Sequence, residues 1–457
     1  MKIDYDIVVV GGGPGGYVAA IRASQLGKKV AIVEESELGG VCLNWGCIPT
    51  KSLLKNAYVF DLIKNSSKYG IDITDYKVNW KKIIQRSRNI SKRLNKGIEF
   101  LMNKNNIKFF NSKANILDNN TLSLYGSGEL IKTKNIIIAT GTKQKNLPGI
   151  RLDGKKIISS REAMVLNEIP KKITIIGAGA IGVEFAHLYN TFGSEVTLIE
   201  SMSRILPNED EDISKELTSI FSKRKINILT SQKVLEVESL KNHVKISLDN
   251  HELNTDILLV AIGVTGNISN IGLKKIGVET DKGFILKNKY LQTNIKNIYA
   301  IGDVSGPPLL AHVASSEAIV AVEHICNHNS REMNYKNIPA CTYCEPEIAS
   351  VGLTEKQAKD SGYSIKVGKF PFRALGKSLA DGSHEGFVKV IYDDKYGELL
   401  GCHIIGHNAS NLISEVGIAR MLETTYHEIL KTVHPHPTLS EAIHEATADA
   451  FKEAIHI

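Results

Sequence analysis

Residues 5–34 read YDIVVVGGGPGGYVAAIRASQLGKKVAIVE. A short β-branched run leads into a glycine turn, an amphipathic stretch closed by Gly27 follows, and a second apolar run ends in the acid Glu34. This order predicts a strand, a helix and a second, parallel strand. Glycines in such a turn permit tight bending and let a pyrophosphate approach the helix N-terminus. They are Gly11, Gly13 and Gly16.

The same pattern returns at residues 172–200, KITIIGAGAIGVEFAHLYNTFGSEVTLIE. Its helix would close at Gly193 and its second strand ends in Glu200, and its turn contains Gly177, Gly179 and Gly182. In both copies the acid lies 23 residues after the first glycine, where it can bind a ribose hydroxyl. One glycine motif is weak support, but two copies in the same context predict two dinucleotide sites.

The remaining segments predict an α/β protein with two Rossmann-like domains and a C-terminal α+β domain. We expect the runs NIIIATGT (135–142) and DILLVAIGV (256–264) to return the chain to the two nucleotide domains. From about residue 336, β-rich runs precede helix-like ones, which indicates a third domain. We therefore expect four segments: 1–143 begins the first nucleotide domain, 144–264 forms the second, 265–335 completes the first, and 336–457 is the C-terminal domain.

Composition narrows the class of protein. The 457 residues are 42% hydrophobic and 23% charged, which is typical of a soluble globular protein. A net charge of +7 is mild for this length and its lysine clusters look scattered, so we expect no nucleic-acid partner. No apolar run approaches the length of a membrane helix, and the N-terminus lacks a secretory region. We expect a cytoplasmic protein without a membrane partner.

Residues 39–54, GGVCLNWGCIPTKSLL, contain the close pair Cys42 and Cys47. A metal site is disfavoured because no second Cys or His pair lies nearby at zinc spacing. A structural disulfide would close a six-residue loop and contribute only about 2 kcal/mol. The redox interpretation has a mechanism: Pro49 predicts a helix start, which favours a thiolate at Cys47, and Lys51 adds a cation.

This cysteine motif, the two glycine turns, ATG (139–141), YAIGD (299–303) and HPTLSE (436–441) together resemble the pyridine nucleotide-disulfide oxidoreductases, and within them the dihydrolipoamide dehydrogenases. The resemblance runs essentially end to end. It implies a homodimeric flavoprotein, with the C-terminal domain for dimerisation, that oxidises protein-bound dihydrolipoamide through a Cys42–Cys47 redox disulfide and FAD and reduces NAD⁺. The implied partners are the lipoyl domain and core acyltransferase of a 2-oxoacid dehydrogenase complex, or the lipoylated carrier of glycine cleavage.

The resemblance also assigns residues to the cofactors. The first turn with Glu34 would hold FAD, and Lys51, paired with Glu184, would sit at the flavin ring. Further FAD residues would be Ala114 near the adenine, Thr140, Gly141, Thr142, Asp303, and the turn of Leu309, Leu310, Ala311 and His312. NAD would bind Gly177, Gly179, Gly182, Glu200, Val234 and Gly263. The carboxylate of Glu200 would repel a 2′-phosphate, so NAD is favoured over NADP.

By the same resemblance, His436 accepts the substrate proton and Glu441 orients its imidazole, both from the opposite subunit, while Cys42 takes the substrate and Cys47 faces the flavin. Read alone, Thr438 and Glu441 form a capping box, so Glu441 could be purely structural.

Three features depart from the family's usual pattern. Family members commonly have an arginine within Val264–Asn267, where this chain has none, and Trp45 and Pro435 are also less usual. The alternative function is an NADPH-dependent disulfide or mercuric reductase of the same fold. Glu200 and the absence of cysteines after Cys402 argue against it.

Overall fold

The computed structural model describes residues 3–147 and 149–457, and the chain separates into two compact units. Unit 1 contains the residues up to 53 together with 78–146 and 263–333. Unit 2 contains 54–77, 147–262 and 334–457. Unit 1 thus unites most of the two segments expected to form one domain. Unit 2 holds both the segment expected to form the second nucleotide domain and the C-terminal segment, so the finer domain division stays a prediction.

The sheet of unit 1 positions the first glycine turn. β1 (Tyr5–Val10) lies between β2 (Val30–Glu34) and β6 (Leu130–Ile138) and is parallel to both. β3 (Lys108–Asn111) extends the sheet beyond β2, and β19 (Ile298–Ala300) pairs with β6. The β-branched runs of these strands are buried on both faces, as helix-covered parallel strands require. Val10 pairs with Val33 and Ile138, so three strands end at the same edge.

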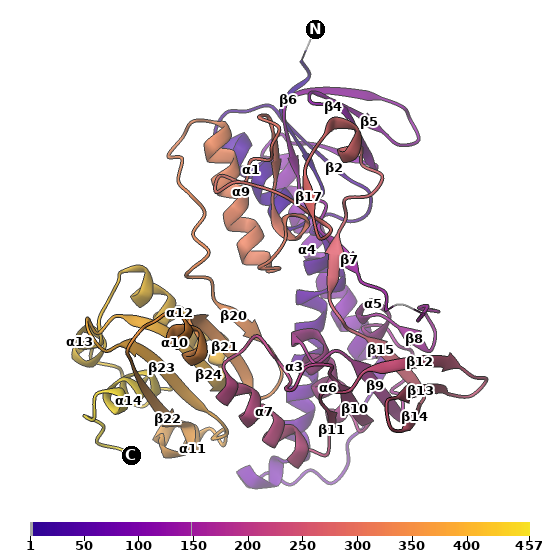
Figure 1. Ribbon diagram of the computed structural model, residues 1–457. Coiled ribbons are helices and arrows are strands. Elements are labelled where there is room, and N and C mark those ends of the chain that lie inside the picture. Colours follow the sequence, from indigo (N-terminus) through magenta and orange to yellow (C-terminus); the bar gives the residue numbers. More distant parts are fainter. Residues whose placement is uncertain (1–2, 148) are drawn as a thin grey trace. The chain divides into compact units, whose positions relative to one another are not determined.

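Helices follow these strand ends. α1 (Pro14–Gln25) has proline at its first position and Gly27 beyond its end, at a φ of 75°. α9 (Ala311–Ile325) runs beside α1 (Figure 1), and Arg22 pairs with Glu323 at 2.6 Å. α2 (Gly40–Trp45), α3 (Cys47–Lys64) and the 25-residue α4 (Trp80–Lys104) come between β2 and β3.

The smaller elements of unit 1 complete its edges. An antiparallel extension of β6 is formed by β5 (Thr121–Leu124) and β4 (Ala114–Asp118). Two short ribbons pair β7 (Thr142–Gln144) with β16 (Val264–Gly266) and β17 (Thr280–Asp281) with β18 (Phe284–Ile285). The remaining helical turns are α8 (Leu273–Ile276) and η2 (Gly302–Ser305).

Unit 2 repeats the strand–helix–strand pattern. β9 (Lys172–Ile176), α6 (Ala180–Thr191) and β10 (Glu195–Ile199) form the second βαβ motif, with β9 and β10 parallel. The parallel sheet has the order β11-β10-β9-β15-β8. Its other strands are β11 (Asn227–Leu229), β15 (Ile257–Val260) and β8 (Ile157–Ile158), and α5 (Ser160–Ala163) and α7 (Glu211–Lys223) lie between them in the chain. A separate antiparallel sheet contains β12 (Val234–Ser239), β13 (Val244–Leu248) and β14 (Glu252–Thr255).

The C-terminal part of unit 2 is an antiparallel sheet with helices packed on it. Its order is β20-β21-β24-β23-β22, with strands at Ala340–Thr342, Glu347–Gly352, Leu399–Gly406, Phe387–Asp393 and Ile365–Pro371. α12 (Ala409–Met421) contacts β21 and β24, while α14 (Glu441–Ala450) contacts β22 and β23. Short helices α10 (Glu355–Asp360), η3 (Phe372–Ala374), α11 (Gly376–Ala380) and α13 (Tyr426–Lys431) connect these elements.

The structure confirms the predicted fold class: two parallel sheets carry the glycine motifs, and an α+β arrangement follows. Both predicted βαβ units form, the first with the expected boundaries and the second with a last strand that ends at Ile199, one residue before Glu200. No helix among the described residues is long and apolar enough to cross a membrane.

Candidate redox and dinucleotide sites

The first glycine turn joins β1 to α1 and requires its glycines for steric reasons. Gly11 has a φ of 108°, and a Cβ there would lie 2.2 Å from the carbonyl oxygen of Ala139. A Cβ on Gly16 would lie 1.9 Å from the carbonyl oxygen of Gly11. Gly13 is the N-cap of α1 and supplies no capping side chain. The glycines thus let the chain turn tightly into α1, whose N-terminus has no side-chain cap, and an uncapped helix N-terminus is suited to bind a pyrophosphate.

The second turn, between β9 and α6, has the same construction. Gly177 has a φ of 99°, and a Cβ on Gly182 would lie 1.9 Å from the Gly177 carbonyl oxygen. A Cβ on Gly179 or on Gly263 would meet no atom within 4 Å, so the backbone there is open to a ligand. Val234, the remaining predicted NAD residue, begins β12 and is half-buried.

Each acid closes its own turn. The Oε2 of Glu34 accepts the N–H of Gly12 at 2.7 Å, and the Oε2 of Glu200 accepts that of Ala178 at 2.8 Å. The second oxygen of each carboxylate accepts a backbone N–H two residues further along the chain. Burial raises the pKa of Glu34 and outweighs these hydrogen bonds, which favour the charged form. Both acids thus lie at the turn where a ribose would bind, and both turns fit a dinucleotide.

The other residues predicted for FAD lie around the carboxyl end of β6 and the start of α9. The Oγ1 of Thr142 is 3.4 Å from Oδ2 of Asp303, and burial raises the pKa of Asp303. Gly141, between Thr140 and Thr142, has a φ of 67°. Leu309 and Leu310 precede α9, whereas Ala311 and His312 are its first residues, so only the first half of the expected turn is non-helical. Ala114 is buried in β4.

The segment without the expected arginine has its own contacts. Thr140 donates its hydroxyl to the carbonyl of Asn267 at 2.9 Å, and Asn267 donates its amide to the carbonyl of Thr140 at 2.9 Å. The backbone of Val264–Gly266 pairs with that of Thr142–Gln144. Asn267 was not among the predicted residues, because no sequence motif marks it.

The cysteine pair spans the junction of two helices. Cys42 lies within α2 and Cys47 is the first residue of α3, two positions before Pro49. A hydrogen bond with Cys47, then burial and the charge of Cys47, raise the pKa of Cys42, while Lys51 lowers it. The two sulfurs therefore lie within hydrogen-bonding reach, and Cys47 occupies the positive end of a helix.

The loop between the cysteines is held by α4. Asn44 is buried; its carbonyl accepts Nη1 of Arg88 at 2.5 Å and its Oδ1 accepts Nδ2 of Asn95 at 2.6 Å. The Arg88 guanidinium also lies 4.0 Å from the centroid of the Trp45 ring. Ser87 donates to the carbonyl of Pro49 at 3.0 Å. These supporting residues were not predicted, because they lie some 40 residues from the cysteines in the sequence.

Lys51 and Glu184 belong to different units, so their predicted pairing stays a prediction. Lys51 lies one turn after Cys47 in α3. Glu184 is buried in α6 and accepts the N–H of Tyr343 at 3.0 Å. Each side chain is thus held on a helix.

The predicted base lies in front of α14. The Nδ1 of His436 is 2.8 Å from Oε1 of Glu441, and the His436 side chain is 79% exposed. Oε2 of Glu441 accepts the N–H of Thr438 at 2.8 Å. Burial opposes ionisation of Glu441, but these two hydrogen bonds leave its pKa lowered. Glu441 thus contacts His436, as its orienting role requires, and the backbone N–H of Thr438, as a capping role requires.

The capping-box interpretation is wrong in one respect. Helix α14 begins at Glu441 with Ser440 as its N-cap, and the Thr438 hydroxyl donates to the carbonyl of Pro435 instead of capping the helix. Neighbouring His434 is only 7% exposed, and its Nε2 lies 2.7 Å from Oε1 of Glu415. The exposed histidine is therefore the one available to a substrate.

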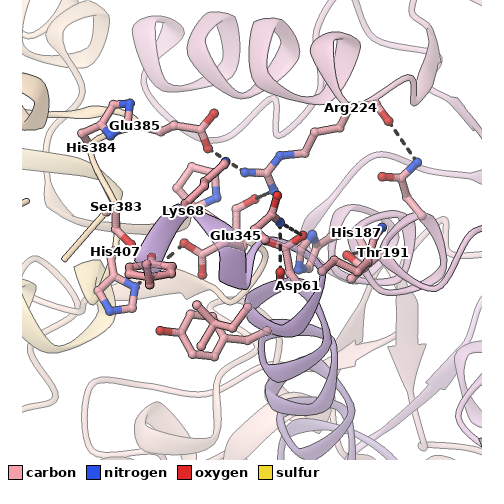
Figure 2. A pocket seen from close by; sticks show the side chains of 18 residues that line it. Asp61, Lys68, His187, Thr191, Arg224, Glu345, Ser383, His384, Glu385 and His407 are labelled. Atoms are coloured by element: carbon pink, nitrogen blue, oxygen red, sulfur yellow. Dashed lines mark hydrogen bonds and ion pairs between the residues drawn. The ribbon is translucent and has the colours of Figure 1, made fainter. Parts of the chain in front are cut away.

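A separate cavity of about 540 Å³ lies within unit 2 (Figure 2). None of the residues that line it was predicted as a site residue. Arg224 donates to the carbonyl of Glu345 and to the carboxylate of Glu385, each at 2.6 Å, across the cavity wall. Burial lowers the pKa of His187 to about 4, so this histidine is neutral at physiological pH.

Comparison with known proteins agrees with this geometry. Residues 5–318 match the family model described as pyridine nucleotide-disulphide oxidoreductase, and residues 338–447 match the dimerisation domain of that family. The dihydrolipoyl dehydrogenase of Zymomonas mobilis is 43% identical and that of Rhizobium etli 44% identical, each over 100% of both chains. The HOCl-induced flavoprotein disulfide reductase RclA from Escherichia coli is 26% identical with a TM-score of 0.89, over 97% of this chain and 99% of that one.

Proposed function

The chain belongs to the pyridine nucleotide-disulphide oxidoreductase family, and on this premise we propose that it acts as a dihydrolipoyl dehydrogenase. It oxidises protein-bound dihydrolipoamide to lipoamide and reduces NAD⁺, with FAD and NAD as its cofactors. The observation that carries the proposal is the cysteine pair at the start of α3, in a chain with two dinucleotide turns. The two turns accommodate two nucleotides, and the cysteine pair supplies the dithiol chemistry that connects them to the substrate.

The chemistry at the cysteines is thiol–disulfide exchange. His436, oriented through Nδ1 by Glu441, accepts a proton from one substrate thiol, and the resulting thiolate attacks Sγ of Cys42 in the Cys42–Cys47 disulfide. Cys47 leaves as a thiolate, which the positive end of α3 favours. The second substrate thiol then forms the lipoamide disulfide and releases Cys42, so two electrons pass from the substrate dithiol to the protein. FAD, when bound at the first turn, would supply a two-electron acceptor for the reduced cysteine pair and a hydride donor for NAD⁺.

Residues of this chain set the cofactor preference and the environment of the pair. The buried carboxylate of Glu200 accepts two backbone N–H groups at the turn where a 2′-phosphate would lie, and a carboxylate at that position favours NAD over NADP. In α3, Lys51 would lie at the flavin ring, paired with Glu184. Contacts of Arg88 and Asn95 with Asn44 hold the loop between the two sulfurs in one position.

The assembly follows from the dimerisation domain at residues 338–447. We propose a homodimer in which each His436 serves the cysteine pair of the other subunit. Its protein partners are the lipoyl domain and core acyltransferase of a 2-oxoacid dehydrogenase complex, or the lipoylated carrier of glycine cleavage, in the cytoplasm.

The decisive experiment is an anaerobic titration of the purified protein with dihydrolipoamide and then NAD⁺, followed by visible spectroscopy. Reduction of the bound flavin by the first addition and its reoxidation by the second are expected. A protein that stays oxidised with dihydrolipoamide would refute the proposal. Steady-state rates with NAD⁺ and NADP⁺ separate it from the alternative, an NADPH-dependent disulfide or mercuric reductase of the same fold, since a clear preference for NADP would favour that alternative.

A further inference from the structure

The charge of the chain is concentrated in one helix. Helix α4 contains eight of the 56 lysines and arginines but only one of the 49 aspartates and glutamates, Glu99. The rest of the chain therefore has 48 basic and 48 acidic residues. The formal net charge of +7 therefore resides in this helix. The lysine pair at 81–82, which looked like scattered surface in the sequence, is the beginning of this concentration.

The helical period places four of these cations along one line. Lys82, Arg86, Arg93 and Lys96 are spaced by 4, 7 and 3 residues, so they share a stripe, which we call the basic face. All four are exposed. The first three, with Gln85, Asn89 and Ile90, line a shallow hollow on the helix surface.

Among the described residues these cations have no acidic partners, although Arg86 donates to the hydroxyl of Ser52 at 2.8 Å. Within residues 3–147 and 149–457, none of the four side chains of the basic face forms an ion pair. Lysines on other helices are paired four residues away, as in Lys215 with Glu211 and Lys356 with Asp360. A row of uncompensated cations creates a local positive potential that attracts acidic surfaces.

The opposite face of α4 holds the redox loop. Arg88 and Asn95 bond to Asn44, and Ser87 bonds to the carbonyl of Pro49, so α4 contacts the chain on both sides of Cys47. A protein whose acidic surface binds the outer face of α4 would therefore contact the helix that positions the cysteine pair.

We propose that the basic face of α4 docks an acidic surface of the carrier domain that bears the dihydrolipoyl group. This inference rests on the proposed function, in which the substrate arrives attached to a protein. A nucleic acid fits less well, because no aromatic side chain is interleaved with the four cations. A membrane also fits less well, because Leu94 and Phe100 are the only exposed large apolar side chains of α4, too few to form the apolar face of a membrane-bound helix.

The test is the double charge reversal Lys82→Glu/Arg93→Glu, compared with Lys274→Glu/Lys275→Glu on α8, which changes the net charge equally at exposed positions of unit 1. Two substrates are used: free dihydrolipoamide and a purified, reduced lipoylated carrier domain.

At low ionic strength the α4 variant, Lys82→Glu/Arg93→Glu, should lose at least about 10-fold in kcat/KM for the carrier domain, because electrostatic steering is removed. Its kcat/KM for free dihydrolipoamide should stay within about twofold. Added salt should remove the difference between variant and wild type, and calorimetric titration should show weaker binding of the carrier domain.

Each contrary outcome has its own meaning. Equal losses with both substrates, equal losses in the α8 control, or unchanged carrier kinetics would overturn the docking proposal. It would also be overturned if wild-type protein bound single-stranded RNA or anionic phospholipid vesicles, and the α4 variant lost that binding while keeping its carrier kinetics. Wild-type protein that fails to oxidise free dihydrolipoamide would instead refute the proposed function itself.

Discussion

Cys42 and Cys47 are chemically distinct although only five positions separate them. A hydrogen bond with Cys47, burial and the charge of Cys47 together raise the pKa of Cys42. Cys47 instead opens a helix. In the reduced pair the hydrogen bond with Cys47 and the charge of Cys47 therefore hold the proton on Cys42.

This difference predicts the behaviour of Cys47→Ser. The substitution removes the thiolate charge that holds the Cys42 proton, so the pKa of Cys42 should fall relative to the reduced wild type. Alkylation of Cys42 by iodoacetamide, mapped by mass spectrometry across pH, should show a lower midpoint. Cys326→Ser, at another half-buried thiol of unit 1, should leave that midpoint unchanged. A midpoint that stays or rises in Cys47→Ser would contradict the assignment.

The two histidines before α14 give a matched pair of substitutions. His436→Gln removes an exposed base, so kcat/KM for dihydrolipoamide should fall by about 10² or more while the unfolding temperature changes little. His434→Gln removes a buried partner of Glu415, so it should lower the unfolding temperature and leave turnover within a few-fold. Steady-state kinetics and thermal denaturation of both variants check this. Reversed effects would show that His434 is the base.

At the scale of elements, the glycine turns were predictable because their requirement is local. A strand, a turn without Cβ atoms and a helix follow one another between Tyr5 and Gln25, and the acid returns to the turn through the next strand. The support of the cysteine loop by α4 was not predictable, because Arg88 and Asn95 meet Asn44 only after folding. The start of α14 was misjudged for a different reason: the Thr438 hydroxyl donates to the carbonyl of Pro435, three residues earlier, and so does not cap the helix.

A glycine pair tests the turn. Gly16→Ala would place a Cβ 1.9 Å from the carbonyl oxygen of Gly11, so the backbone must shift and FAD should be lost or weakly bound. Gly97→Ala, in the middle of α4, would meet no atom within 4 Å, so it should keep FAD and gain about 0.5–1 kcal/mol of helix stability. The flavin-to-protein absorbance ratio of the purified variants and their chemical denaturation measure both effects. Full flavin content in Gly16→Ala would contradict this account of the turn.

On the scale of the whole molecule, the sequence indicated three domains by pattern, while the contacts group the chain into two units. A buried ion cluster helps explain why the second nucleotide segment and the C-terminal segment belong to one unit. Lys389, only 2% exposed in β23, lies 2.8 Å from Asp210, 2.9 Å from Asp212 and 2.7 Å from Glu355. Asp210 also caps α7, which follows the second nucleotide motif. The acidic run at 208–212 thus lies at a helix start and also binds a lysine from the C-terminal sheet, a long-range contact that no local pattern could reveal.

Lys389→Met should therefore destabilise unit 2 strongly. Asp210 would remain buried without its cation, at a cost of about 3–5 kcal/mol. Lys369→Met, at a half-exposed lysine 3.7 Å from Asp212, should cost no more than about 1 kcal/mol. Urea denaturation of both variants at neutral pH measures the difference, and equal values would show that the cluster contributes no more than a surface ion pair.

The same cluster makes the stability of unit 2 depend on pH in the acid range. Burial opposes ionisation of Asp210 and Asp212, but bonds from Lys389 leave the pKa of both carboxyls lowered, and Lys359 and Lys389 lower that of Glu355. Their contribution is therefore complete above the unfolded pKa values of about 4 and is lost as the pH falls through the lower folded values. In Lys389→Met the unpaired carboxylates protonate more readily, which relieves their burial cost in acid. The stability gap between wild type and Lys389→Met should thus be constant from pH 8 to about pH 6 and shrink below about pH 5, and a gap that widens in acid would contradict the cluster's role.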